Sequence, residues 1–247
     1  MAGRAFSADS ICPEINGMNR KEKEIETKRR LMEATEAVFS RRGFAQATVD
    51  EIIALADTGK GTLYKYFGNK DNVFYTLVSH KHSELMERMW SVADDTEKSV
   101  EERMADILAV WIEFLRKNTV LWQVLCFEMT CTNRGFSGVE DENGEVRLVS
   151  RWGKLPPPEE QEGILRYHRL LAEENKPILK VYEEGIRQNI FCEMAQHKDI
   201  AVHMFLAVAM IVFFHSSGDI EKISARDFAA NFVKTRLYGL IRHNNEL

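Results

Sequence analysis

The stretch from residue 48 to 67 constrains the fold of this 247-residue chain more than any other, because two short helical patterns meet there across a tight turn. Apolar residues recur at i, i+3, i+4 and i+7, the spacing of one helical stripe: Val49, Ile52, Ile53 and Ala56. Thr48 precedes this stripe and is a good N-cap. Asp57-Thr58-Gly59 then favours a turn, since glycine readily takes positive φ and aspartate tolerates it. The segment predicts a helix-turn-helix.

The second helix of this motif has two different faces. Leu63 and Phe67 lie one helical turn apart and are expected to face a core. Five residues remain on the outer side: Lys60, Gly61, Thr62, Tyr64 and Lys65. Lysines can neutralise phosphates, hydroxyls can bond phosphates or base edges, and glycine lets the backbone approach a duplex. Asn69 is expected to cap the next helix, where Lys70 and free N–H groups would form a second phosphate site.

The segment from about residue 27 to 85 resembles the TetR-type DNA-binding domain. That family typically has a basic first helix ending in a Gly-aromatic corner, a Thr-capped second helix, a Lys-Gly-Thr-Leu-Tyr recognition helix and a Lys that opens the fourth helix. The matching parts are Lys28–Arg42, Gly43-Phe44, Thr48, Lys60–Phe67 and Lys70. The usual Gly-Val-Ser turn is replaced by Asp57-Thr58-Gly59, and glycine is a cap poorer by only a few tenths of a kcal/mol.

The resemblance implies an all-α homodimer with a three-helix head, a long fourth helix and a larger helical body. It implies that Tyr64 and Lys65 face the major groove. It also implies that Thr48, Lys60, Tyr66 and Lys70 hold phosphates, which gives eight DNA-binding candidates: Thr48, Lys60, Gly61, Thr62, Tyr64, Lys65, Tyr66 and Lys70. The implied function is repression of transcription from near-palindromic double-stranded operator DNA, relieved by an unknown small-molecule effector. An inducer-free DNA-binding regulator, or an activator, is the alternative.

The chain divides into a flexible tail at residues 1–24, a DNA-binding domain at 25–85 and a body at 86–247. The fourth helix is expected from residue 70 to about 92, because its apolar spacing meets no Pro or Gly. Further helices are expected at 100–117, 120–131, 164–174, 177–196, 200–214 and 225–243. Residues 135–158 are an insertion with four glycines and three consecutive prolines. Its Asn143-Gly144 pair predicts a hairpin.

Two of these helices form the expected dimer interface. Residues 200–214 are apolar on nearly every side, yet too short for a membrane span, which needs about 20 apolar residues. Such a helix must be covered on two sides, by its own body and by a partner. With residues 225–243 it would form a four-helix bundle between two chains. The interface candidates are Phe205, Ile211, Phe228, Phe232, Leu237 and Leu240.

Aromatic residues of the body are the candidates for effector binding: Trp111, Phe114, Trp122, Phe127, Tyr167 and Tyr182. A mostly apolar pocket with a few polar anchors would suit them. Aromatics at helical spacing are also typical of a plain core, and that reading stays open.

Charge and composition exclude several classes of protein. The chain has a formal net charge of −5, but residues 19–70 hold eleven basic and eight acidic residues, which makes the head basic and the rest acidic. The four cysteines include no C-x-x-C pair, and the seven histidines are dispersed, so we expect no metal site, no cofactor and no enzyme activity. No secretory signal is visible at the start, which predicts a cytoplasmic protein with no membrane partner.

Overall fold

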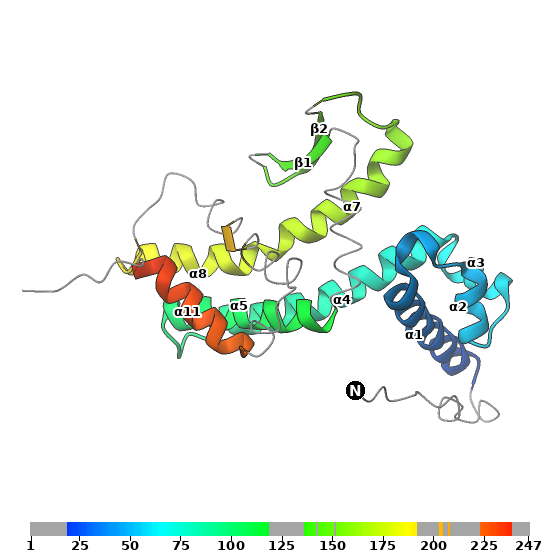
Figure 1. Cartoon of the computed structure of the whole chain (residues 1–247), viewed down its shortest axis with the longest axis horizontal. Helices are drawn as coiled ribbons and strands as arrows, with labels where there is room; N and C mark the ends of the chain where they lie inside the picture. The colour runs from blue at the N-terminus through cyan, green and yellow to red at the C-terminus, as the bar shows by residue number, and fades with distance from the viewer. Residues whose placement is uncertain are drawn as a thin grey trace, which may run out of the picture. The chain divides into compact units, whose positions relative to one another are not determined.

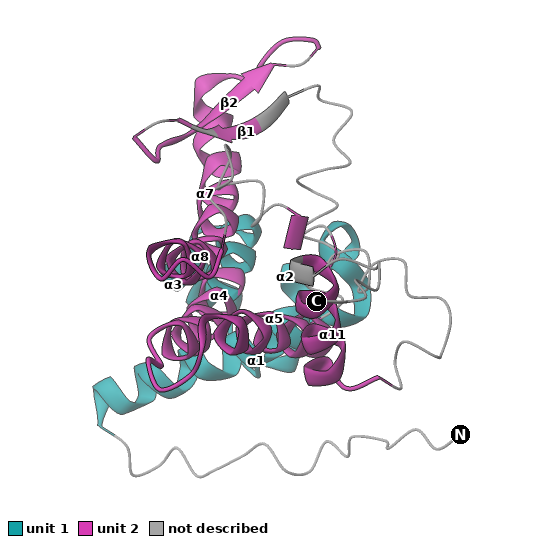
Figure 2. Cartoon of the chain, turned by 90° about the vertical axis from the view of Figure 1, so that its left-hand side faces the viewer, with its two compact units in different colours: residues 1–77 teal, residues 78–247 magenta. Residues whose placement is uncertain are grey.

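The computed structural model describes residues 19–118, 136–141, 143–150, 152–191, 203–204, 207 and 223–238. The chain forms two compact units, residues 1–77 and 78–247 (Figure 2). The two units meet inside the fourth helix, between residues 77 and 78. The helical character of the chain is confirmed, and each unit is described by itself below.

The first unit contains α1 (Arg20–Gln46), α2 (Val49–Leu55), α3 (Lys60–Phe67) and the start of α4 (Lys70–Ala93) (Figure 1). Asn19 caps α1 in a capping box with Glu22, so residues 20–24, which were predicted as tail, are helical. Gly43 has φ 72° and ψ 173°, a conformation that favours glycine. The predicted break at this glycine is confirmed: the regular helix is interrupted at Gly43, and a short helical segment follows it to Gln46. Phe39, Phe44 and Phe74 pack together, with ring centroids 4.9 to 5.8 Å apart.

The second unit contains the rest of α4, then α5 (Val100–Lys117), α7 (Pro158–Glu174), α8 (Lys176–Arg187) and α11 (Ala225–Tyr238). Helix α5 is its centre, since α8 and α11 both pack on it (Figure 1). A capping box of Ser99 and Glu102 begins α5, and its predicted bounds are confirmed. The α11 face on α5 is formed by small buried residues at four-residue spacing: Ala225, Ala229 and Val233.

Helix α8 ends earlier than predicted. We expected it to reach residue 196, but Asn189 adopts φ 56° and the N–H groups of Ile190 and Phe191 turn back to the Gly185 carbonyl, at 2.8 and 3.1 Å. Asparagine tolerates this left-handed conformation at a helix C-terminus. The ring of Phe191 then covers Gly185 so closely that an added Cβ would lie 2.1 Å from it. The Asn189 turn and this close packing end the helix.

The insertion contains the predicted hairpin. Strands β1 (Phe136–Glu140) and β2 (Val146–Ser150) pair antiparallel with Gly138 opposite Leu148, and Gly144 in the connecting turn has φ 82°. The hairpin packs on α7, where the ring of His168 would be 2.5 Å from a Cβ added at Gly138. This hairpin is the exception to an otherwise all-helical description.

Several predictions lie outside the described residues. These are the helix at 120–131 with Trp122 and Phe127, most of the helix at 200–214 with Phe205 and Ile211, and the end of the last helix with Leu240. Leu237 lies on α11, but its side chain is also outside the described part. Among the helices that are described, none is long and apolar enough to cross a membrane.

Candidate nucleic-acid interface

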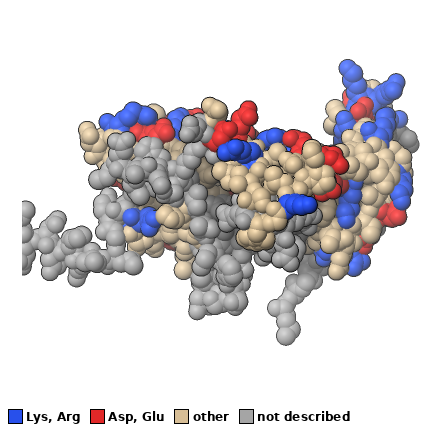
Figure 3. Space-filling view, turned by 90° about the horizontal axis from the view of Figure 1, so that it is seen from above, with Lys and Arg blue, Asp and Glu red and all other residues tan. Residues whose placement is uncertain are grey.

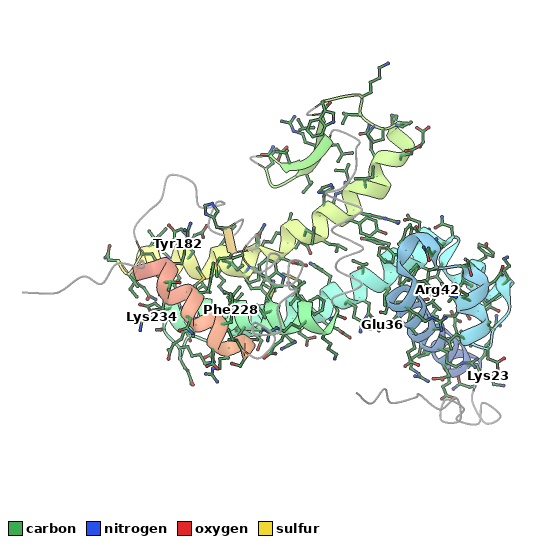
Figure 4. The ribbon with its side chains drawn as sticks, in the orientation of Figure 1. Lys23, Glu36, Arg42, Tyr182, Phe228 and Lys234 are labelled. Carbon is green, nitrogen blue, oxygen red and sulfur yellow. The ribbon has the colours of Figure 1, made fainter. Side chains whose placement is uncertain are left out.

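The start of α2 is held by its own side chains. The Glu51 N–H donates to Thr48 Oγ1 at 3.2 Å, and the Glu51 carboxylate accepts from the Thr48 N–H at 3.2 Å. Arg42 of α1, which is labelled in Figure 4, donates to the same carboxylate at 3.0 Å. The Thr48 N–H, and then the Thr48 hydroxyl and Arg42, lower the pKa of Glu51. The Thr48 hydroxyl, predicted to hold a phosphate, therefore also serves as a helix cap.

The turn between α2 and α3 differs in one detail from the prediction. Asp57, rather than Gly59, takes the positive φ, with a value of 49°. Gly59 has φ −86° and caps α3 without any side-chain hydrogen bond. The backbone conformation at position 59 can therefore be adopted by residues other than glycine. The left-handed conformation is at Asp57, and aspartate tolerates it better than most residue types.

Helix α3 has the two faces that its sequence predicts. Leu63 is fully buried and Phe67 half-buried, whereas Tyr64 is 43% exposed. The rest of the predicted outer face is also accessible: Lys60, Gly61 and Lys65 are exposed, and Thr62 and Tyr66 are half-buried. A Cβ added at Gly61 would meet nothing within 4 Å. The outer side of α3 is thus open enough for another molecule to approach its backbone.

Cations surround this helix. Lys60 donates to Asp50 of α2 at 3.0 Å, and this hydrogen bond raises the pKa of the ammonium. Such an exposed pair is worth only about 0 to 1 kcal/mol, so a phosphate can compete for Lys60. Lys28 of α1 and Lys65 lie 5.0 and 5.5 Å from the ring centroid of Tyr66. Figure 3 shows Lys and Arg gathered over the unit of α1 to α3, at the right of the view.

Lys70 has a structural role that the sequence did not reveal. Its ammonium donates to the carbonyls of Phe44 and Ala47 at 2.8 and 2.9 Å, and it lies 4.6 Å from the ring centroid of Phe44. Two of its three N–H groups are therefore directed at the link between α1 and α2. Asn69 caps α4 as predicted, accepting from Asn72 N–H at 2.8 Å.

We expect Lys70→Ala to lower the free energy of unfolding by about 1 to 3 kcal/mol, because it leaves two half-buried carbonyls without their donor. Urea unfolding followed by circular dichroism measures this. Lys65→Ala is the matched control, since Lys65 is exposed and should change stability by less than about 0.5 kcal/mol. Equal stability of the two variants would show that Lys70 does not hold the α1–α2 link.

The predicted effector-binding residues that are described lie within one unit. Trp111 and Phe114 on α5 and Tyr182 on α8 are buried, and Tyr167 on α7 is half-buried. Tyr182 stacks on Phe191 with centroids 5.7 Å apart. This burial suits both a core and the wall of a binding site.

Two titratable residues in the same unit were missed by the sequence analysis. Glu174, the last residue of α7, is fully buried, and His82 of α4 is 3% exposed. Their signal was present in the pattern, since Glu174 continues the spacing of Tyr167 and Leu171 along one face of α7. Charged residue types are rarely fully buried, so the residue type itself gave no reason to single out this position.

Comparisons with known proteins agree with this geometry. Residues 31–75 match the family model of "Bacterial regulatory proteins, tetR family". An HTH-type transcriptional repressor from Streptomyces coelicolor, SCO4008, is 37% identical over 90 residues, which cover 36% of this chain and 46% of that protein. The nucleoid occlusion factor SlmA from Haemophilus influenzae is 27% identical over 119 residues, 47% of this chain and 54% of that protein. The matches thus span about half of each relative.

Solved structures resemble nearly the whole chain. The transcriptional regulator FadR from Bacillus subtilis, in complex with stearoyl-CoA, superposes with a TM-score of 0.64 and 17% identity, covering 87% of this chain and all of that one. The fatty acid degradation regulator FadR from Bacillus halodurans gives a TM-score of 0.65 and 19% identity, with the same coverage. At such identities the likeness concerns the fold. Residues 31–75 of the first unit therefore form a TetR-type helix-turn-helix, and the whole chain shares its fold with these regulators.

Proposed function

We propose that this protein binds operator DNA through α3 and represses transcription until a small-molecule effector releases it. The outer face of α3 carries this proposal, because it offers cations, hydroxyls and an open glycine while Leu63 fixes the helix from behind. In a helix-turn-helix, the second helix lies in the major groove and reads base edges. Tyr64 and Lys65 would contact bases, and Thr48, Lys60, Tyr66 and Lys70 would contact phosphates.

Gly61 gives the sharpest test of this docking. Since a Cβ there meets nothing within the chain, Gly61→Ala should leave the fold intact or stabilise it by up to about 1 kcal/mol. The same methyl would push the α3 backbone away from a duplex, so we expect operator affinity to fall by about tenfold or more. Fluorescence anisotropy on a site selected from a random DNA pool measures the affinity.

Gly163→Ala is the matched control for this substitution. Gly163 lies within α7, in the other unit, and a Cβ there also meets nothing within 4 Å. It should keep wild-type operator affinity. Wild-type affinity in Gly61→Ala as well would remove this face of α3 from the DNA interface.

A homodimer is the second part of the proposal. On α11, Phe228 and Phe232 are half-buried and stack on each other with centroids 6.3 Å apart, beside the buried face that packs on α5 (Figure 4). Aromatic pairs that one chain covers only in part suit an interface core. Two heads would then meet half-sites roughly 34 to 36 Å apart on a near-palindrome.

We expect Phe232→Asp to give monomers in light scattering, because a charge left unpaired in an apolar interface costs several kcal/mol. Lys234→Asp is the control, since Lys234 is exposed on the same helix and should leave the dimer intact. A Phe232→Asp protein that remains a folded dimer would place the interface elsewhere.

Control by an effector is the third part. The fold neighbour from Bacillus subtilis was solved in complex with stearoyl-CoA, which supports a ligand site in a body of this fold. Helix α4 begins next to the DNA-binding helix and continues into the second unit, so a ligand that prefers one state of the body can change DNA affinity by its preference for that state. The likeness to a nucleoid occlusion factor favours the alternative of an inducer-free DNA binder.

A further inference from the structure

The junction of α7 and α8 holds a buried ionisable group that has no charged partner among the described residues. Glu174 is the last residue of α7, and Pro177 follows near the start of α8. The Glu174 side chain is 0% exposed, and within the described part of the chain its carboxyl oxygens have no hydrogen bond of good geometry, although the indole N–H of Trp111 lies near enough to act on them. It forms no ion pair with any described residue. By contrast, buried Arg103 has a carboxylate partner and buried His82 contacts a backbone carbonyl group.

Among the residues that the structure describes, none supplies a positive charge to Glu174. The neighbouring polar group is the indole of Trp111 on α5, itself fully buried, which lowers the pKa of the carboxyl. Burial has the larger effect and raises that pKa to about 8. Burial also lowers the pKa of His82 and of His168, so both imidazoles favour the neutral form.

Burying a carboxyl such as that of Glu174 lowers the stability of the folded protein. Buried polar groups in native proteins are almost always hydrogen-bonded, and a carboxyl left alone loses its hydration without compensation. A leucine or glutamine at position 174 carries no charge in the unfolded chain, so it would not have to be neutralised on folding. A buried carboxyl whose described polar neighbour is a neutral indole, with no cation beside it, is therefore a candidate for a group that a ligand completes.

We propose that Glu174 is the anchor for a positively charged nitrogen of the effector, held between the carboxylate and the ring of Trp111. This inference rests on the proposed effector control and names the chemical class of the effector. An opposite charge within a few ångströms restores the ionised carboxylate. The face of an indole is the aromatic surface that attracts cations most strongly. A neutral ligand would instead meet a protonated carboxyl. A cationic and a neutral ligand therefore differ in whether a proton is released on binding.

Binding of a cation must release a proton. The carboxyl holds its proton near neutral pH in the free protein, and the ammonium stabilises the form without it. The amine is already protonated in water, so the proton that is released comes from the carboxyl of Glu174. The number of protons released per ligand bound equals the fraction of Glu174 that is protonated in the free protein, at most one. A neutral ligand leaves the proton in place.

The same junction is connected to the helix that leaves the DNA-binding unit. The ring of His82, on α4, hydrogen-bonds to the backbone of Leu170, one helical turn before Glu174 on α7. Because Glu174 is sealed from solvent, a ligand reaches it only after the packing around α7 has opened. The His82 contact is thus a described link through which a displacement of α7 would reach α4.

Two probe series test the ligand class, one with an octyl and one with a naphthylmethyl body, each ending in ammonium, hydroxyl or carboxylate. Isothermal titration calorimetry in two buffers of different ionisation enthalpy gives affinity and proton release together. The full-length dimer is compared with Glu174→Gln, which keeps the shape of the side chain. Glu173→Gln is the control, since Glu173 is the adjacent acid and is not fully buried.

In at least one series the ammonium probe should bind the wild type about tenfold or more tighter than the hydroxyl probe and release a proton. Glu174→Gln should lose both the preference and the release, while Glu173→Gln keeps both. If ammonium binds no better than hydroxyl in both series, or if Glu174→Gln retains the preference, the assignment is overturned. Operator binding measured without ligand distinguishes failure of the ligand class from failure of the proposed function. Intact DNA binding with no preference for ammonium refutes only the ligand class. Absence of DNA binding refutes the proposed function.

Discussion

Replacing Arg103 with alanine should lower the free energy of unfolding by about 3 kcal/mol. This is the largest loss of stability that we expect from removing one buried side-chain contact in the second unit. Arg103 lies on α5 and is 1% exposed. Its guanidinium donates to both carboxylate oxygens of Glu184 on α8, at 2.9 and 2.6 Å, and to the Ala93 carbonyl at the end of α4, at 2.9 Å. One side chain therefore joins three helices.

The expected loss lies at the lower end for buried pairs because the side chain of Glu184 is 22% exposed and can regain some hydration. Urea unfolding at neutral pH gives the value. Lys98→Ala is the control, since Lys98 pairs with Asp106 at 2.8 Å on the surface and should cost less than about 1 kcal/mol. The double variant Arg103→Met with Glu184→Leu should recover most of the stability, and equal losses in Arg103→Ala and Lys98→Ala would contradict a buried clamp.

The parts of the fold that the sequence predicted well are those that local chemistry determines. Helix α2 begins where Thr48 and Glu51 can form a capping box, and α5 begins where Ser99 and Glu102 do the same. The hairpin turn at residues 143–144 follows from the positive φ that Gly144 supplies. Each of these signals lies within a few residues of the structure that it specifies.

The parts that were missed depend on residues far apart in the sequence. Lys70 is read as a phosphate ligand in its local context, yet the carbonyl of Phe44 that it binds lies 26 residues earlier. The end of α8 depends on how the ring of Phe191 fits over Gly185. Spacing alone shows neither a distant carbonyl nor the room left by a missing Cβ.

The functional residues likewise include some that the sequence predicts and some that it does not. The outer face of α3 could be assigned from spacing, because an eight-residue helix with Leu63 in the core exposes the opposite side. The role of Glu174 could not, since a charged residue on an amphipathic helix is normally placed in water. Only the packing of α5 against this position reveals that the carboxyl is buried.

Glu174→Gln should make the protein more stable than the wild type in alkaline solution, with the gap widening as pH rises. The folded carboxyl has a pKa of about 8, against 4.5 for the ordinary group, so between these values the folded state holds a proton that the unfolded state has lost. Stability of the wild type therefore falls as pH rises through this window, by roughly 1.4 kcal/mol per unit, and levels off above pH 8. Glutamine does not titrate and removes this slope.

The cleanest interval is about pH 6.5 to 8.5, where the wild type should lose about 2 kcal/mol relative to Glu174→Gln in urea unfolding. His82 does not interfere there: its lowered pKa costs stability only as pH falls below the ordinary histidine value of 6.5, the opposite direction. Glu173→Gln should follow the wild-type curve in this interval; Glu173 raises the pKa of His82, so the two curves are compared above pH 6.5 only. Parallel curves for wild type and Glu174→Gln would mean that the carboxyl is ionised in the folded protein and already has a cationic partner, so no effector would be needed to supply one.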